Sequence, residues 1–314
     1  MKIVFFGTPE IAVPALKALI ESRHEVVGVV TQPDRPSGRG MTTKYSPVKQ
    51  AALEADIPVL QPASIKNRDE EDAIRALNAD LFVVIAFSQL LPKWFLEIAP
   101  YGCINIHPSM LPKYRGAAPL RGAILNGDTT FGVTIMKMAE KLDAGDILLQ
   151  KEFPMEKKET VVTLTPKAAK IGAEMLLEVV DSIEAGTAKA TPQDEAQQSY
   201  IKQLDKEDGR IRFEKSAECI ERQIRGCTPW PSAFTKLSGK TFKIWDADVV
   251  DAPEGVECTG VPGTVIYADK RTVLVECSGS CLSLKEVQME GKKRMGIEEF
   301  LRGKKLEKGF VFGE

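Results

Sequence analysis

The sequence predicts an α/β protein: a Rossmann-like, mostly parallel sheet domain followed by a small C-terminal antiparallel β-barrel of the OB-like type. An apolar strand, a turn, a helix and a second strand follow one another over residues 2–31, which is a βαβ opening. Short strand-like runs between Gly-, Pro- and Asp-rich turns fill the last third. Because the stretch between is polar, we expect a sheet domain over 1–189, a linker over 190–208 and a barrel over 209–314.

The opening unit begins with KIVFF at 2–6, an apolar strand, and Gly7 supplies a tight turn. Thr8 suits a helix N-cap and Pro9 the first helical position. Apolar residues then recur at helical spacing from Ile11 to Ile20, and VVGVVT at 26–31 forms the second strand.

Later apolar runs predict the rest of the sheet, at 58–60, 81–87, 103–107 and 132–138. The run 81–87 is apolar throughout, as expected of a central strand buried on both faces. A helix over about 167–186 closes the domain, with Gly186 as its C-cap. In the barrel we expect strands within 242–250, 263–268, 271–277 and 280–288.

Composition excludes several classes of function. The chain has 314 residues and a net charge of -2, so bulk attraction cannot drive nucleic-acid binding and only local basic patches could. Six cysteines without a CxxC pair and only two histidines argue against a zinc site and suit a cytoplasmic protein. GTPEIA follows the first strand in place of GxGxxG, which argues against a dinucleotide. No apolar stretch suits a signal peptide or reaches the roughly 20 residues that span a bilayer.

The run CINIHP places an amide and an imidazole together. Side chains alternate along a strand, so Asn105 and His107 share a face, at the carboxyl end where open α/β sheets bind ligands. Both can donate hydrogen bonds to a developing oxyanion, and a carboxylate could hold the imidazole. The candidate is Asp143, in a loop given freedom by Gly145. Alternatively, His107 is a satisfied histidine at a strand end and Asp143 a turn residue.

Three motifs in this order, GTPEIA at 7–12, NIHPSMLPKYRGAAP at 105–119 and LDAGDIL at 142–148, resemble the folate-dependent formyltransferases. The resemblance implies that Asn105, His107 and Asp143 are the catalytic set, that 10-formyltetrahydrofolate is the co-substrate, and that no metal is needed. Ser88 stands where that family often has Gly. The resemblance also implies a folate and formyl site lined by Phe87, Gln89, Leu90, Ser109, Met110, Leu111 and Pro112.

The basic residues of the long loop at 31–49 suit contacts with phosphates, although a solvated loop would have the same composition. Resemblance to the family members that formylate tRNA implies initiator methionyl-tRNA as the partner of a monomer. It implies tRNA contacts from Arg39 and Lys206, and the basic loop and the cluster at 292–294 offer further phosphate contacts from Arg35, Lys44, Lys292, Lys293 and Arg294, although a solvated cluster would have the same composition. We expect Trp230, between two prolines, to be a packing anchor.

The expected reaction transfers a formyl group from the folate to the α-amine of methionine on initiator tRNA, for translation initiation. Two alternatives remain open: a formyltransferase acting on a small amine, either glycinamide ribonucleotide or an amino sugar, and a non-catalytic RNA-binding protein. The second domain argues against glycinamide enzymes, which typically end near the first domain.

Overall fold

The structure is a computed structural model that describes residues 1–37 and 42–313. It divides into two compact units. The first holds residues 1–119, 130–154 and 164–202; the second holds 120–129, 155–163 and 203–314. Within the part of the chain that is described, no helix has the length and apolarity needed to cross a membrane.

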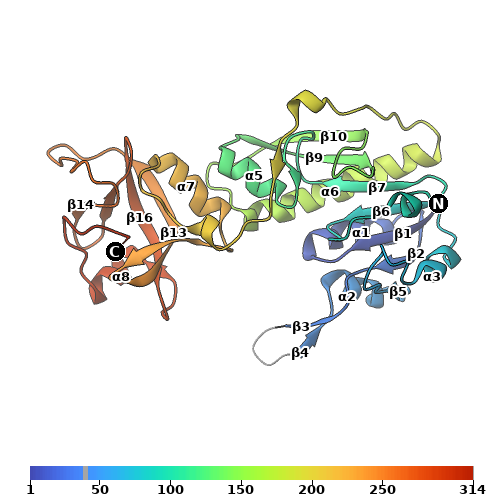
Figure 1. The fold of residues 1–314 in the computed structure, drawn as a ribbon, viewed down its shortest axis with the longest axis horizontal. Helices are drawn as coiled ribbons and strands as arrows, with labels where there is room; N and C mark the ends of the chain where they lie inside the picture. The colour runs from blue at the N-terminus through green and yellow to red at the C-terminus, as the bar shows by residue number, and fades with distance from the viewer. Residues whose placement is uncertain (38–41, 314) are drawn as a thin grey trace. The chain divides into compact units, whose positions relative to one another are not determined.

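The first unit is built on a seven-stranded sheet of order β10-β9-β7-β6-β1-β2-β5 (Figure 1). Five neighbouring strands are parallel, and β9 runs antiparallel to both of its neighbours, β7 and the edge strand β10, so the sheet is mixed and mostly parallel. This confirms the fold class, and the strand predicted at 103–107 is confirmed residue for residue. The strands are β1 (Lys2–Gly7), β2 (Glu25–Val30), β5 (Val59–Leu60), β6 (Leu81–Ile85), β7 (Cys103–His107), β9 (Thr130–Lys137) and β10 (Ile147–Pro154).

The helices that accompany this sheet are mostly short. They are α1 (Val13–Ile20), α2 (Pro47–Glu54), α3 (Glu71–Ala76), α4 (Lys93–Leu96) and the long α6 (Val161–Glu184). Gly172 of α6 lies so close to the sheet that a Cβ there would be 2.9 Å from Cγ2 of Ile106. Helix α6 therefore packs on the face to which Ile106 points, and Asn105 and His107 point to the other face.

Four details of the predicted elements were wrong. Thr8 caps no helix: a 3-10 turn over Glu10–Ala12 comes first, and Thr8 Oγ1 accepts a hydrogen bond from the backbone N–H of Gln32 at 3.3 Å. The strand expected to reach residue 87 ends at Ile85, because Ala86 has a left-handed backbone with φ of 50°. Helix α6 begins six residues before the expected 167 and contains Pro166. Strand β10, which is half-exposed and carries charges, was not predicted.

The second unit contains a six-stranded antiparallel sheet and the helices α7 (Ala217–Gly226) and α8 (Ile297–Gly303). An apolar core of strand residues with Phe213, Phe300 and Phe312 holds it together. Trp230 is 48 % exposed, so the expectation that it packs in a core was wrong. The strands are β12 (Ala233–Leu237), β13 (Lys240–Val250), β14 (Val265–Ala268), β15 (Val273–Glu276), β16 (Cys281–Met289) and β17 (Met295–Gly296). The segment α5 (Pro119–Asn126) also belongs to this unit, apart from its first residue.

Candidate active site

The candidate site centres on His107, the last residue of β7, a strand buried between β6 and β9. His107 is 5 % exposed and Asn105, on the same face, is 9 % exposed. The His107 Nε2 atom lies 2.9 Å from the carbonyl oxygen of Tyr114. Since a carbonyl can only accept, Nε2 carries the hydrogen in this contact, and Nδ1 is the ring atom left to face other groups.

Asp143 faces that second nitrogen. Its Oδ2 lies 3.8 Å from His107 Nδ1, and both side chains are largely buried. This separation is longer than a hydrogen bond, so each group can also contact a third polar atom placed between them. The same Oδ2 accepts a hydrogen bond from the backbone N–H of Gly116 at 2.7 Å, which fixes the carboxylate. The structure thus brings together two residues that are distant in the sequence.

The loop that carries Asp143 reaches His107 by an unexpected route. Because β9 is antiparallel to β7, its end at Lys137 lies opposite Ile104, at the start of β7. The chain after β9 therefore folds back to bring Asp143 to the ring. Gly145 does not supply the expected conformational freedom: a Cβ there would lie 1.7 Å from the Lys137 carbonyl oxygen, so the loop needs Gly for space.

The segment Ser109–Pro112 follows His107 and is tied to the neighbouring strands. The Leu111 amide donates to Thr134 Oγ1, and the Thr134 hydroxyl donates to the Ser109 carbonyl at 2.6 Å. The Leu111–Pro112 peptide bond is cis. Met110 packs against Gly132, where a Cβ would lie 2.2 Å from its sulfur, and Ser109 and Leu111 are buried. The segment therefore meets the site chiefly through its backbone.

In the loop after β6, Phe87 packs in the core and Gln89 forms local hydrogen bonds. Phe87 is 2 % exposed and packs edge-on against Phe6 in the core. Gln89 uses its oxygen to accept from the Ile65 amide at 2.9 Å, whereas Leu90 is 57 % exposed. Ser88 has a φ of 64°, the left-handed region that favours glycine. Backbone groups are again the more available part of this loop.

Four residues of these loops, Ala86, Ser88, Tyr114 and Asp143, have left-handed backbone, as do six other non-glycine residues in the part of the chain that is described. Non-glycine residues in this region are uncommon, and strain of this kind gathers at functional sites because the surrounding structure maintains it. Because such residues also occur elsewhere in the described chain, these conformations define the shape of the loops around His107 and do not by themselves assign a function to them.

Residues 1–180 match the family model described as formyl transferase, and residues 203–305 match formyl transferase, C-terminal domain. The chain belongs to the formyl transferase family. A curated relative from Lachnospira eligens, called methionyl-tRNA formyltransferase, is 47 % identical over 315 residues, covering 100 % of both chains.

Solved members of the formyl transferase family share the fold. The methionyl-tRNA formyltransferase from Clostridium thermocellum superimposes with a TM-score of 0.57 at 16 % identity, over 92 % of this chain and 98 % of that one. The sugar 3N-formyl transferase WlaRD, solved in the presence of dTDP and 5-N-formyl-THF, gives a TM-score of 0.67 at 20 % identity, over 93 % and 99 % of the two chains.

The basic residues expected to contact tRNA lie on both units. Arg35 and Lys44 are exposed and pair in register in a small hairpin, β3 (Arg35–Ser37) and β4 (Thr42–Lys44), which projects from the sheet (Figure 1). Arg39 lies outside the described residues. On the second unit Lys206 is exposed, as are Lys292, Lys293 and Arg294 in the turn between β16 and β17.

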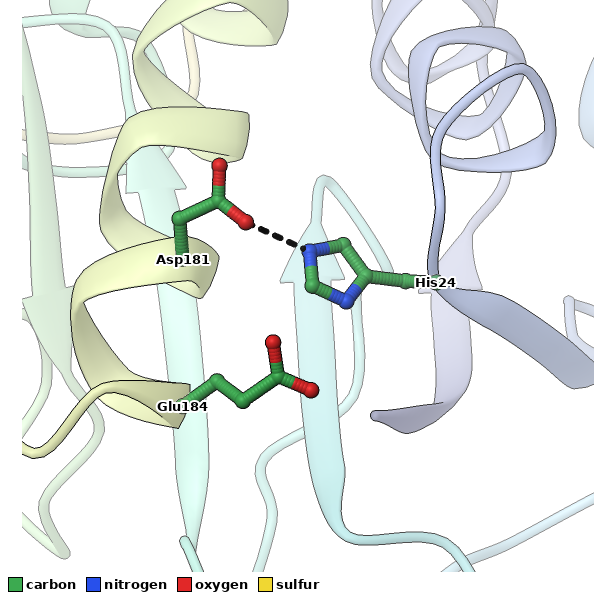
Figure 2. A group of neighbouring side chains, drawn as sticks. All are labelled: His24, Asp181 and Glu184. Atoms are coloured by element: carbon green, nitrogen blue, oxygen red, sulfur yellow. Dashed lines mark hydrogen bonds and ion pairs between the residues drawn. The ribbon is translucent and has the colours of Figure 1, made fainter.

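Among residues 1–37 and 42–313, one group of three potential metal ligands gathers: His24, Asp181 and Glu184 (Figure 2). His24 Nε2 lies 3.1 Å from Asp181 Oδ1, and the Arg23 guanidinium lies 2.6 Å and 2.5 Å from oxygens of the two carboxylates. The hydrogen bond from Arg23 lowers the pKa of Asp181. Arg23 therefore already supplies a positive charge to both carboxylates. His24 directly precedes β2, so it lies at the amino end of a parallel strand, whereas His107 lies at the carboxyl end of β7.

Sequence reasoning missed the residues that hold the site together. The Tyr114 carbonyl and the Gly116 amide are backbone groups, which carry no signature in side-chain chemistry. Arg115 lies between them and is 0 % exposed, with its guanidinium 2.7 Å from both Gln193 and Glu195. The signal for Arg115 was present, because it lies within the motif that carries the family resemblance.

Proposed function

We propose that this chain transfers the formyl group of 10-formyltetrahydrofolate to the free α-amino group of methionine on initiator methionyl-tRNA, giving N-formylmethionyl-tRNA. The observation that carries the proposal is similarity along the whole chain to curated relatives called methionyl-tRNA formyltransferase, at 47 % identity for the Lachnospira eligens protein. The contact between His107 and Asp143 supports it independently, because it supplies a group that can move protons next to groups that can hold an oxyanion.

In this mechanism the methionine amine arrives neutral and attacks the formyl carbon. The new N–C bond turns the formyl oxygen into an oxyanion, which accepts hydrogen bonds from the Asn105 amide and from a hydrogen on His107 Nδ1, while Nε2 keeps its hydrogen bond to the Tyr114 carbonyl. Asp143 orients His107 through Nδ1 and helps the proton of the attacking amine reach the folate N10. The bond between N10 and the formyl carbon then breaks, leaving tetrahydrofolate and the formylated amine.

For the folate we propose a site between two backbone-rich loops, residues 86–92 and Ser109–Pro112. Supporting this, the side chains of Phe87, Gln89 and Leu111 are engaged in packing or in local hydrogen bonds. Backbone N–H and C=O groups are then the natural partners for the polar edge of a pterin. In further support, the sugar 3N-formyl transferase WlaRD was solved in the presence of 5-N-formyl-THF.

The tRNA contacts that we propose are electrostatic. Arg35, Arg39 and Lys44 come from the hairpin segment, while Lys206 and the turn at 292–294 come from the second unit. In support, the described members are exposed, as contacts to phosphates require. We further propose that the chain acts as a monomer in the cytoplasm, and that residues 209–314 form the tRNA-binding part.

The rival substrates are small amines, glycinamide ribonucleotide and amino sugars. The full-length relatives favour methionyl-tRNA, and the match to the C-terminal family model over 203–305 accounts for a second unit. A decisive experiment gives the purified protein 10-formyltetrahydrofolate labelled in the formyl group and a mixture of acceptors. We expect label on initiator methionyl-tRNA; label on a small amine alone would refute the proposal.

A further inference from the structure

Gln193 lies after α6, in a segment that returns to the catalytic face of the first unit. Two residues before it, Thr191 and Ile147 exchange backbone hydrogen bonds of 2.8 Å and 2.9 Å, which tie the segment to the first residue of β10. The loop that carries Asp143 ends just before Ile147. Gln193 is thereby delivered to that loop by backbone pairing.

Both the nitrogen and the oxygen of the Gln193 side-chain amide form hydrogen bonds. Nε2 donates to the carbonyl oxygens of Asp143 at 2.9 Å and of Gly145 at 2.7 Å. Oε1 accepts from Arg115 Nε at 3.1 Å and from Nη2 at 2.7 Å. Turning the amide over would set its NH₂ against a guanidinium and its oxygen against two carbonyls, so only one orientation is compatible. The amide therefore joins two loops in a defined geometry.

The two loops are those that fix the reacting side chains. Arg115 lies between Tyr114, whose carbonyl faces His107, and Gly116, whose amide holds Asp143. Its guanidinium is buried, so an unpaired donor there would be costly. Glu195 reinforces the connection by binding Arg115 at 2.7 Å and Lys141 of the Asp143 loop at 2.6 Å. These two hydrogen bonds lower the pKa of Glu195 to about 2.

We propose that Gln193 is a positioning residue for formyl transfer: it fixes the Asp143 loop against Arg115 and so sets the Asp143 carboxylate relative to His107. This inference rests on the proposed function. Gln193 acts through the backbone carbonyl of Asp143, to which its Nε2 donates. Because small misplacements of a catalytic group can cost about 100-fold in rate, loss of this amide should slow turnover more than it weakens folate binding.

The test compares Gln193→Met and Gln193→Glu with Gln197→Met and Gln197→Glu. Gln197 lies in the same segment, is exposed and donates to the nearby Asp194. Wild type must first formylate methionyl-tRNA, which separates failure of the proposed function from failure of this inference. We then expect both Gln193 variants to lose about 10- to 100-fold in kcat per folded molecule, with the KM for the folate within about twofold. The Gln197 variants should match wild type.

A purely structural role gives a different result. It would lower the melting temperature and the folded fraction, measured by circular dichroism, while kcat per folded molecule stayed at the wild-type value. Adding Gln193→Met to Asp143→Asn provides a second readout: if Gln193 acts through Asp143, the double variant is no slower than Asp143→Asn alone. An unchanged kcat, or losses that multiply in the double variant, would overturn the inference.

Discussion

Tyr114 and Gly116 contribute only backbone atoms to the candidate site, yet they hold the two groups on which the proposed chemistry depends. Strand alternation was enough to predict that Asn105 and His107 share a face, and the order of motifs was enough to nominate Asp143. The partners of these side chains could not be predicted, because every residue carries a carbonyl and nearly every residue an amide. Only tertiary structure selects which of them meets a given side chain.

The variant Asp143→Asn tests whether the carboxylate orients His107 and helps to move the proton. The amide keeps the size of the side chain but cannot stabilise a protonated His107, so kcat should fall by about 10²- to 10⁴-fold. The fold should survive, measured by an unchanged melting temperature. Glu140→Gln is the matched control, since it makes the same chemical change on an exposed side chain of the same loop. Wild-type turnover by Asp143→Asn would remove Asp143 from the mechanism.

Among the elements, buried strands were predictable because a short continuous apolar run between turn residues is typical of a strand covered on both faces. Strand β10 was not predicted because its residues are half-exposed and include Lys151 and Glu152, which interrupt the apolar run. The start of α6 was not predicted because a proline usually marks a helix boundary, whereas Pro166 lies within the second turn of this helix. The turn at 86–88 was not predicted because Ala86 and Ser88 have no intrinsic preference for the positive φ that they adopt there.

Ser88 offers a test of that turn. A left-handed conformation costs a residue with a Cβ about 1–2 kcal/mol, and glycine escapes this cost while losing about 0.5–1 kcal/mol of chain entropy. Ser88→Gly should therefore raise the free energy of unfolding in urea by roughly 0.5–1 kcal/mol. Ser88→Ala, which keeps the Cβ, should give no increase. Equal stabilisation by both variants would mean that the hydroxyl, not the backbone, is responsible.

For the whole molecule, a net charge of -2 makes local basic groups decisive for any contact with RNA. Some of those groups already have acidic partners: Lys293 lies 3.4 Å from Glu299, and Arg294 pairs with Glu286 and lies over the Trp245 ring. Such exposed pairs are worth little and exchange readily for phosphate. The sequence showed the basic cluster but not its acidic neighbours, which come from β16 and α8.

The salt dependence of tRNA binding tests this surface. Affinity should fall linearly on a log–log plot against salt, with each phosphate contact contributing about 0.7–0.9 to the slope. Replacing Lys292, Lys293 and Arg294 by Ala should flatten that slope by about 2 to 3 if all three contact phosphates. A variant with Lys and Arg exchanged at the three positions keeps the charge and should keep the slope. An unaltered slope in the alanine variant would assign tRNA binding to other residues.

The segment after α6 bears on how far this polypeptide can be shortened. A truncation ending at Lys189 would retain Asn105, His107 and Asp143, and judged by those side chains alone it would look complete. It would discard Thr191, Gln193 and the two-residue strand β11 (Tyr200–Ile201), which runs beside β8 (Arg115–Gly116). A minimal fragment should therefore end after Lys202, because the scaffolding of the chemistry extends well past its last reactive atom.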